Sequence, residues 1–169
     1  MDRQQIGLKL ALDQLGLSPR LTTFSERLIL QKAVYLAQAA GVQLGYHYNW
    51  YLRGPYSPSL TKDAFAVADE TDRNADYLQG WKLDDTSKKR LVDMKPLIEQ
   101  KQKDADEFPR QMELLASVHF LLINQRAKEN SAELKTVLKR YGKDFTEKQI
   151  KQAIEELNAH GLGPAPQAQ

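Results

Sequence analysis

The pair Gly54-Pro55 interrupts an aromatic stretch, residues 46–53, that reads YHYNWYLR. The stretch alternates aromatic and polar side chains, a period of two that predicts a β-strand. Proline has no amide hydrogen for a ladder and glycine permits a sharp reversal, so we expect the strand to end at this pair. Ser57-Pro58 then predicts the start of a helix, because serine caps and proline suits the first helical position. Residues 46–60 are therefore predicted to form a strand-to-helix corner.

The two faces of the predicted strand differ in chemistry. One face is expected to pack in the core and carries Tyr46, Tyr48, Trp50 and Leu52. The opposite face is expected to be exposed and carries His47, Asn49, Tyr51 and Arg53. Such a row can bind a peptide, a base or a phosphate, since arginine offers a bidentate fork and tyrosine a stacking plane. The structural alternative is a half-exposed strand whose Arg53 pairs with Asp63.

Helical patterns dominate the remaining chain. Thr23 and Glu26 have the capping-box spacing, which predicts a helix that begins after Thr23 and stops near Gly41. Further helices are predicted over residues 2–15, from Ser57, over 86–103, from Pro109, and as a pair within 131–160. A short second strand at 78–83 is expected to pair with the aromatic one.

These patterns predict a mainly α fold: a compact helical domain with a small two-stranded β element. The 169 residues and 41% hydrophobic content suit a single domain, which we expect over residues 1–162, and residues 163–169 are predicted to be a disordered tail. No apolar run approaches the ~20 residues that span a bilayer, and the first residues lack a secretory signal, so a cytoplasmic protein without membrane contact is expected.

Composition excludes several classes of site. The chain has no cysteine, which rules out disulfides, thiolate zinc sites and cysteine nucleophiles. The three histidines, His47, His119 and His160, are isolated in sequence, and His119 is predicted to be a hydrogen-bonded core residue. We therefore expect no metal and no cofactor. Ser57, His47 and Asp63 could be imagined as a triad, but capping explains Ser57 and the nucleophile-elbow motif is missing.

A DNA-binding regulator is the main functional alternative. The helix pair at 131–160 resembles a helix-turn-helix and has a basic side. The candidate DNA-contacting residues are Lys135, Lys139, Arg140, Lys143, Lys148 and Lys151. Glutamates in the second helix dilute this charge, and the formal net charge of the chain is only +2. An enzyme acting on a nucleotide or nucleic acid through the Arg53 corner is the least favoured alternative.

Two segments resemble a known family. The segments "LQKAVYLAQ" and "YNWYLRGPYSPSL" are similar to the Leu-Gln-Lys helix and the Gly-Pro corner of Panacea and SocA-like antitoxin domains, and the Tyr-Ser-Pro form of the corner resembles YwgA-like bacterial proteins. The resemblance covers residues 24–65. The matching positions are Leu30, Gln31, Lys32, Tyr35, Gln38, Trp50, Tyr51, Gly54, Pro55, Tyr56, Ser57 and Leu60.

This resemblance implies a small, mostly helical bacterial domain carried on mobile elements, which neutralises a toxin by direct binding and has no established catalytic residues. The corner differs from the Panacea form, with Pro-Tyr-Ser-Pro in place of Pro-Val-Val-Pro. We expect a non-enzymatic binding protein, an antitoxin-like or mobile-element regulator whose partner is a protein, such as a toxin from a neighbouring gene. The expected contact surface is Tyr51, Arg53 and Tyr56, with Lys32 and Gln38 nearby.

Overall fold

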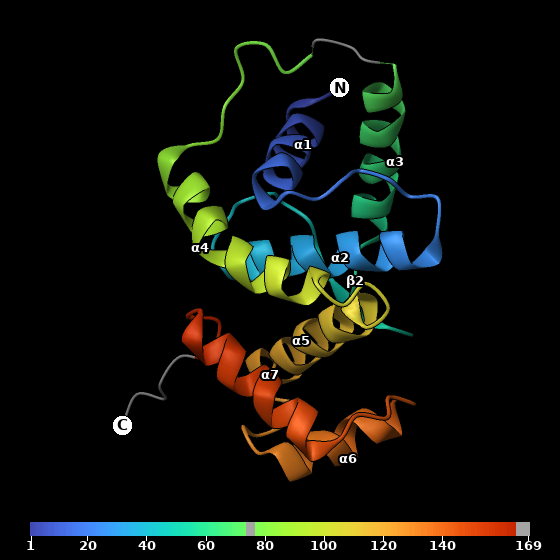
Figure 1. Ribbon diagram of the computed structural model, residues 1–169, viewed down its shortest axis with the longest axis vertical. Helices are drawn as coiled ribbons and strands as arrows, with labels where there is room; N and C mark the ends of the chain where they lie inside the picture. The colour runs from blue at the N-terminus through green and yellow to red at the C-terminus, as the bar shows by residue number, and fades with distance from the viewer. Residues whose placement is uncertain (74–76, 165–169) are drawn as a thin grey trace.

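The computed structural model describes residues 1–73 and 77–164 (Figure 1). Within these residues, seven helices and a two-stranded sheet confirm the mainly α fold with a small β element. In chain order the elements are α1 (Arg3–Leu15), α2 (Phe24–Ala39), β1 (Asn49–Tyr51), β2 (Gly54–Tyr56), α3 (Pro58–Asp72), α4 (Asp85–Gln102), α5 (Phe108–Ile123), α6 (Ser131–Arg140) and α7 (Glu147–Ala159).

Helices α2 and α5 pack against each other at the centre of the molecule (Figure 1). Helices α1, α3 and α4 lie on the α2 side, and α6 and α7 lie on the α5 side. Residues 31–37 of α2 and 112–122 of α5 are buried without interruption. A helix that is buried all round belongs in the interior, which is why these two apolar segments form the core rather than its cover.

Local caps fix the starts of several helices as the sequence predicts. Thr23 with Glu26 forms the expected capping box, and Thr146 with Gln149 forms a second one at the start of α7. The Ser57 hydroxyl accepts a hydrogen bond from the amide of Leu60, and Pro58 is the first residue of α3. The start of α3 therefore follows the predicted cap chemistry. The strand end does not: β1 stops at Tyr51, before Gly54-Pro55, and this pair belongs to the second strand.

The partner of the aromatic strand differs from the prediction. β1 pairs with β2 in an antiparallel hairpin, with Trp50 opposite Pro55 and Tyr51 opposite Gly54. In such a ladder alternate amides point away from the partner strand, so Pro55 can occupy its position without losing a ladder bond. Leu52 and Arg53 form the two-residue connection, and Leu52 is 75% exposed instead of lying in the core.

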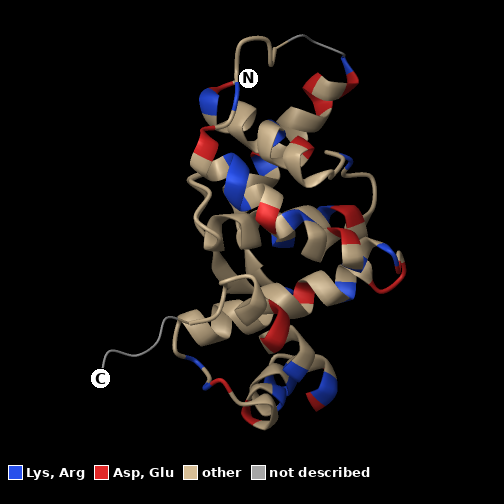
Figure 2. Cartoon of the chain, turned by 60° about the vertical axis from the view of Figure 1, so that its left-hand side comes forward, with Lys and Arg blue, Asp and Glu red and all other residues tan. Residues whose placement is uncertain are grey.

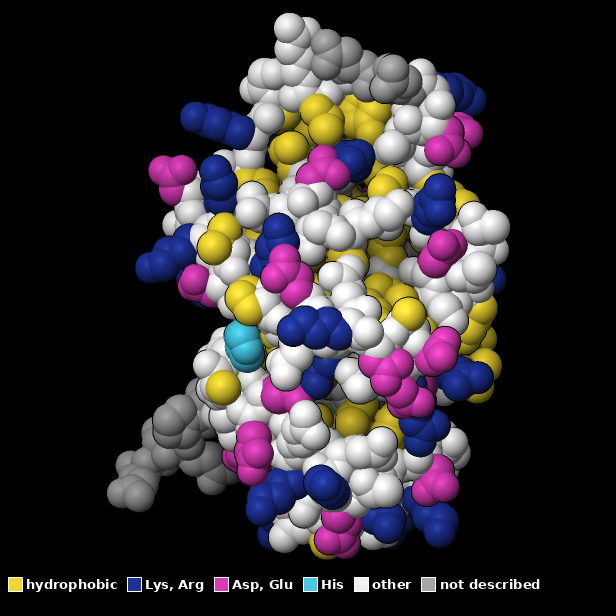
Figure 3. Space-filling view, in the orientation of Figure 1, with side chains coloured by type: hydrophobic (Ala, Val, Ile, Leu, Met, Phe, Trp, Pro, Cys, Tyr) yellow, Lys and Arg dark blue, Asp and Glu magenta, His cyan; other side chains and the backbone are white. Residues whose placement is uncertain are grey.

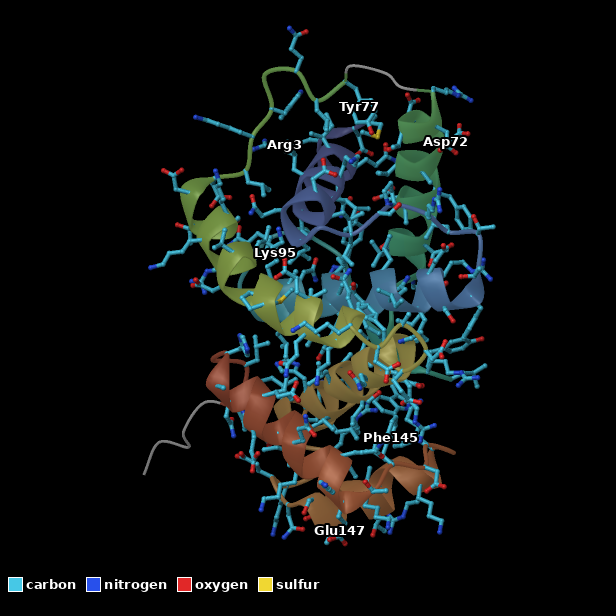
Figure 4. The ribbon with its side chains drawn as sticks, viewed as in Figure 1. Arg3, Asp72, Tyr77, Lys95, Phe145 and Glu147 are labelled. Atoms are coloured by element: carbon cyan, nitrogen blue, oxygen red, sulfur yellow. The ribbon has the colours of Figure 1, made fainter. Side chains whose placement is uncertain are left out.

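Residues 78–83, the predicted second strand, contain no strand. They lie in the loop between α3 and α4, and Trp81, Lys82 and Leu83 line a groove with residues of α1. Figure 4 labels Tyr77 and Arg3 at the same end of the molecule, and the Tyr77 hydroxyl lies 3.0 Å from that of Thr71 in α3. The segment therefore covers α1 and takes no part in the hairpin. Of the predicted tail, residues 165–169 lie outside the described residues.

A candidate binding cleft beside the hairpin

A cleft of about 520 Å³ lies between the hairpin and the amino-terminal parts of α2 and α3. We call it the hairpin cleft. Its lining residues are Phe24, Arg27, Leu28, Gln31, Lys32, Tyr51, Leu52, Arg53, Tyr56, Thr61 and Phe65. Figure 3 shows hydrophobic side chains reaching the surface at the right-hand edge, beside the amino-terminal end of α2. A volume of this size suits two or three large side chains or a small ligand.

The lining includes large apolar side chains that water reaches. Leu52 is 75% exposed, Tyr51 61%, Phe24 55% and Phe65 50%. They come from β1, the hairpin turn, α2 and α3, so the fold brings together residues that are far apart in sequence. Apolar side chains gathered in this way mark interaction sites more often than single exposed ones do.

The predicted outward row faces solvent. His47, Asn49, Tyr51 and Arg53 are all exposed, although only Tyr51 and Arg53 line the cleft. The Tyr51 and Tyr56 rings are 5.6 Å apart, and Thr61 donates a hydrogen bond of 2.9 Å to the Tyr56 hydroxyl. These contacts fix the orientation of the aromatic wall.

The Arg53 guanidinium stacks on an aromatic ring and does not pair with Asp63. It lies 5.5 Å from the centroid of the Phe24 ring, a cation–π distance. Asp63 is buried and accepts hydrogen bonds from the Tyr46 hydroxyl and the Gln5 side chain. The alternative, an Arg53–Asp63 ion pair, is therefore not formed, because α3 turns Asp63 toward the core.

Polar residues of α2 hold the backbone of the corner. Gln38 donates to the Tyr46 carbonyl and accepts from its amide, and Gln31 does the same with Ser57. Lys32 is 1% exposed, and its Nζ donates to the Pro55 carbonyl at 2.6 Å. Both residues therefore lie behind the exposed wall: Gln38 supports the hairpin, and Lys32 forms part of the cleft floor.

A second buried lysine holds the hairpin turn from the other side. Lys143 donates to the Leu52 carbonyl at 3.0 Å and to Glu113 of α5 at 2.8 Å. Burial lowers the pKa of Lys32 to about 7; the negative charge of Glu113 opposes this shift and the positive charge of Lys143 adds to it. Beneath the hairpin, Lys143 thus pairs with Glu113, and the same carboxylate acts on Lys32 only through its charge.

The placement of Lys143 corrects the predicted basic face. Lys139, Arg140, Lys148 and Lys151 are exposed and Lys135 is half-buried, but Lys143 is buried and cannot contact DNA. Figure 2 shows acidic and basic positions interspersed on the α6–α7 pair. Because phosphate contacts supply most non-specific DNA affinity, this mixed surface does not favour the DNA-binding alternative.

His119 is a core residue, as predicted. Its Nδ1 lies 2.7 Å from the Tyr35 hydroxyl, and the bond joins α2 to α5. Burial lowers the pKa of His119 to about 4 and raises that of Tyr35 above its usual value. The pair is therefore neutral at pH 7 and ties the two central helices together.

The cleft also contains residues that the sequence analysis did not single out. Phe24 and Arg27 come from the start of α2, and Phe65 comes from α3. The spacing in α3 predicts that Phe65 is exposed. Leu60, Ala64 and Val67 define the buried stripe of the helix, and Phe65 lies off it. No comparable pattern identifies Phe24.

In the described parts of the chain, no group of three or more His, Asp or Glu side chains is placed to hold a metal ion. Within the same residues, no helix has both the length and the apolar character needed to cross a bilayer. No protein-family model, curated protein or solved structure matches the chain.

Proposed function

We propose that this protein is a non-enzymatic, cytoplasmic binding protein that holds a partner protein in the hairpin cleft. One observation carries the proposal: four large apolar side chains, each at least half exposed, gather around this one cleft. Aromatic and arginine side chains at the centre of a patch are the typical anchors of protein interfaces.

The support beneath the cleft also favours binding. Lys32 and Lys143 hold the backbone on either side of the turn, and Gln31 and Gln38 hold the ends of the corner. A surface fixed in this way loses little conformational entropy when a partner docks. The exposed tips of Leu52 and Arg53 are thus presented on a rigid base.

The partner that we propose first is the product of an adjacent gene with a toxin-like activity. This choice rests on the similarity of residues 24–65 to Panacea and SocA-like antitoxin domains. An antitoxin-like or mobile-element regulator would act by holding such a protein, without catalysis of its own.

The test is isothermal titration calorimetry with the purified neighbouring-gene product. We expect Leu52→Ser and Phe65→Ser each to weaken binding about tenfold or more, as loss of an interface anchor does. Val92→Ser and Ile123→Ser are matched controls, because these side chains are 47% and 49% exposed and lie outside the cleft. A tight complex that survives Tyr51→Ala/Arg53→Ala/Tyr56→Ala together with Leu52→Ser would place the interface elsewhere and overturn the proposal.

A further inference from the structure

The charge of the hairpin cleft has one sign. Arg27, Lys32 and Arg53 line it, and the lining contains no aspartate or glutamate. Asp63, the acidic residue of α3 nearest in sequence to the lining residues Thr61 and Phe65, is buried and bonded to Tyr46 and Gln5. A cleft that combines apolar walls with two arginines that have no carboxylate partner favours an occupant that supplies negative charge.

The two arginines retain bonding capacity, whereas Lys32 is only 1% exposed. Arg27 donates to the Leu21 carbonyl at 2.9 Å, and Arg53 stacks on Phe24. Among the described residues neither arginine forms an ion pair with a carboxylate, and Lys32 Nζ has one hydrogen-bond acceptor, the Pro55 carbonyl. A guanidinium has five N–H donors and binds a carboxylate through two of them, so these side chains can accept acidic groups without giving up their present contacts.

Covering Arg27 and Arg53 with an uncharged occupant would remove their charges from water without compensation, which costs free energy. A carboxylate beside Arg53 or Arg27 offsets that cost, and apolar side chains fit against Phe24, Leu52 and Phe65. The volume of about 520 Å³ limits the inserted part to a few side chains rather than a whole domain face.

We propose that the hairpin cleft binds a segment of the partner protein in which aspartate or glutamate flanks two or three large apolar side chains. The inference rests on the proposed function and adds the chemistry of the recognised segment. Arg53 and Arg27 determine the preference for acidic residues, while Leu52, Phe24 and Phe65 supply the apolar contact area.

The experiment selects phage-displayed random 16-residue peptides on the immobilised full-length protein and measures synthetic copies by fluorescence anisotropy. We expect the selected peptides to combine Asp or Glu with Leu, Phe or Trp, and to lose about tenfold or more affinity when their acidic residues become amides. Arg53→Glu should weaken them at least as strongly. Arg126→Glu is the matched control, because Arg126 is also exposed over a phenylalanine ring, Phe120 at 5.3 Å, but lies outside the cleft.

The outcomes separate this inference from the proposed function. Peptides that require Leu52 and Phe65 but bind Arg53→Glu and wild type equally would overturn the acidic preference and leave protein binding at the cleft intact. If no selected peptide needs Leu52 or Phe65 for its affinity, the inference is overturned. Calorimetry with the neighbouring-gene product then tests the proposed function separately. A wild-type dimer in light scattering that Leu52→Ser dissociates would identify a second copy as the occupant and would also overturn the inference.

Discussion

Gly54 lies so close to Ser117 that a β-carbon added to the glycine would sit 2.4 Å from the serine Oγ. The φ of Gly54 is 89°, a conformation that residues with side chains rarely adopt. The Ser117 hydroxyl is buried and has no hydrogen-bond partner among the described residues. The hairpin therefore starts its second strand directly on α5, at a position where only glycine fits.

We expect Gly54→Ala to reduce the free energy of unfolding by roughly 2–4 kcal/mol, the sum of a positive-φ cost and a steric clash. The same change in a Ser117→Ala background should cost about 1–2 kcal/mol, because only the backbone cost remains. Urea denaturation measures both. Gly142→Ala is a control for the backbone cost, since Gly142 has a φ of 74° and nothing within 4 Å. Equal losses in the two backgrounds would contradict the contact.

Replacing Glu113 should lower the free energy of unfolding, because the buried Lys143 ammonium would lose its carboxylate partner. Glu113→Gln leaves the Lys143 ammonium buried without a carboxylate, and we expect a loss of about 3 kcal/mol or more in unfolding free energy. Glu99→Gln, in the exposed pair with Lys95 at 3.7 Å, should cost less than about 1 kcal/mol. Chemical denaturation compares the two variants. A loss at Glu113 as small as that at Glu99 would show that Lys143 is solvated rather than buried.

Lys32 should make stability depend on pH above neutrality. Its pKa is about 7 in the folded protein against 10.5 in the unfolded chain, so between these values the unfolded chain binds more protons. Wild-type stability relative to Lys32→Met should therefore rise from pH 7 to pH 10, by at most about 1.4 kcal/mol per pH unit. Urea midpoints at pH 6, 7, 8 and 9.5 measure the difference. Parallel curves for the two proteins would show that Lys32 titrates normally.

His119 should make the stability of the fold depend on pH below about 6.5. Its pKa of about 4 in the folded protein lies below the usual 6.5, so the unfolded chain takes up the proton first as the pH falls. Wild-type stability should drop relative to His119→Gln between pH 6.5 and pH 4, by up to about 3 kcal/mol. Denaturation across this range gives the stability difference. A titration of the imidazole by NMR near pH 6.5 would contradict the buried, neutral ring.

The sequence allows the helix starts to be predicted because their causes are local. Thr23 bonds to the amide of Glu26, and Ser57 bonds to that of Leu60, each three residues away. The outward side of the aromatic strand follows from its period of two, which places Tyr51 and Arg53 opposite Tyr46. Such short-range rules hold whatever the rest of the chain does.

The remaining features depend on distant partners. Lys143 can be buried because its ammonium donates hydrogen bonds to Glu113 and to the Leu52 carbonyl, 91 positions away. Its spacing within a basic helix pair gives no sign of this. The sequence hides the partner strand because a proline such as Pro55 is typical of a strand end, although its position opposite Trp50 does not require an amide. The cleft itself joins three separate segments, and periodicity within one segment cannot show that Phe24 and Phe65 meet Leu52.

At the hairpin turn, the main chain is held by buried lysines while the side chains are exposed. Lys143 donates a hydrogen bond to the Leu52 carbonyl, and Lys32 donates one to the Pro55 carbonyl. The side chains of Leu52 and Arg53 are exposed to solvent. A codon-randomised library at positions 52 and 53 should therefore yield mostly folded variants with altered partner preference. The same separation would allow natural sequences to diversify at this turn while the interior stays constant.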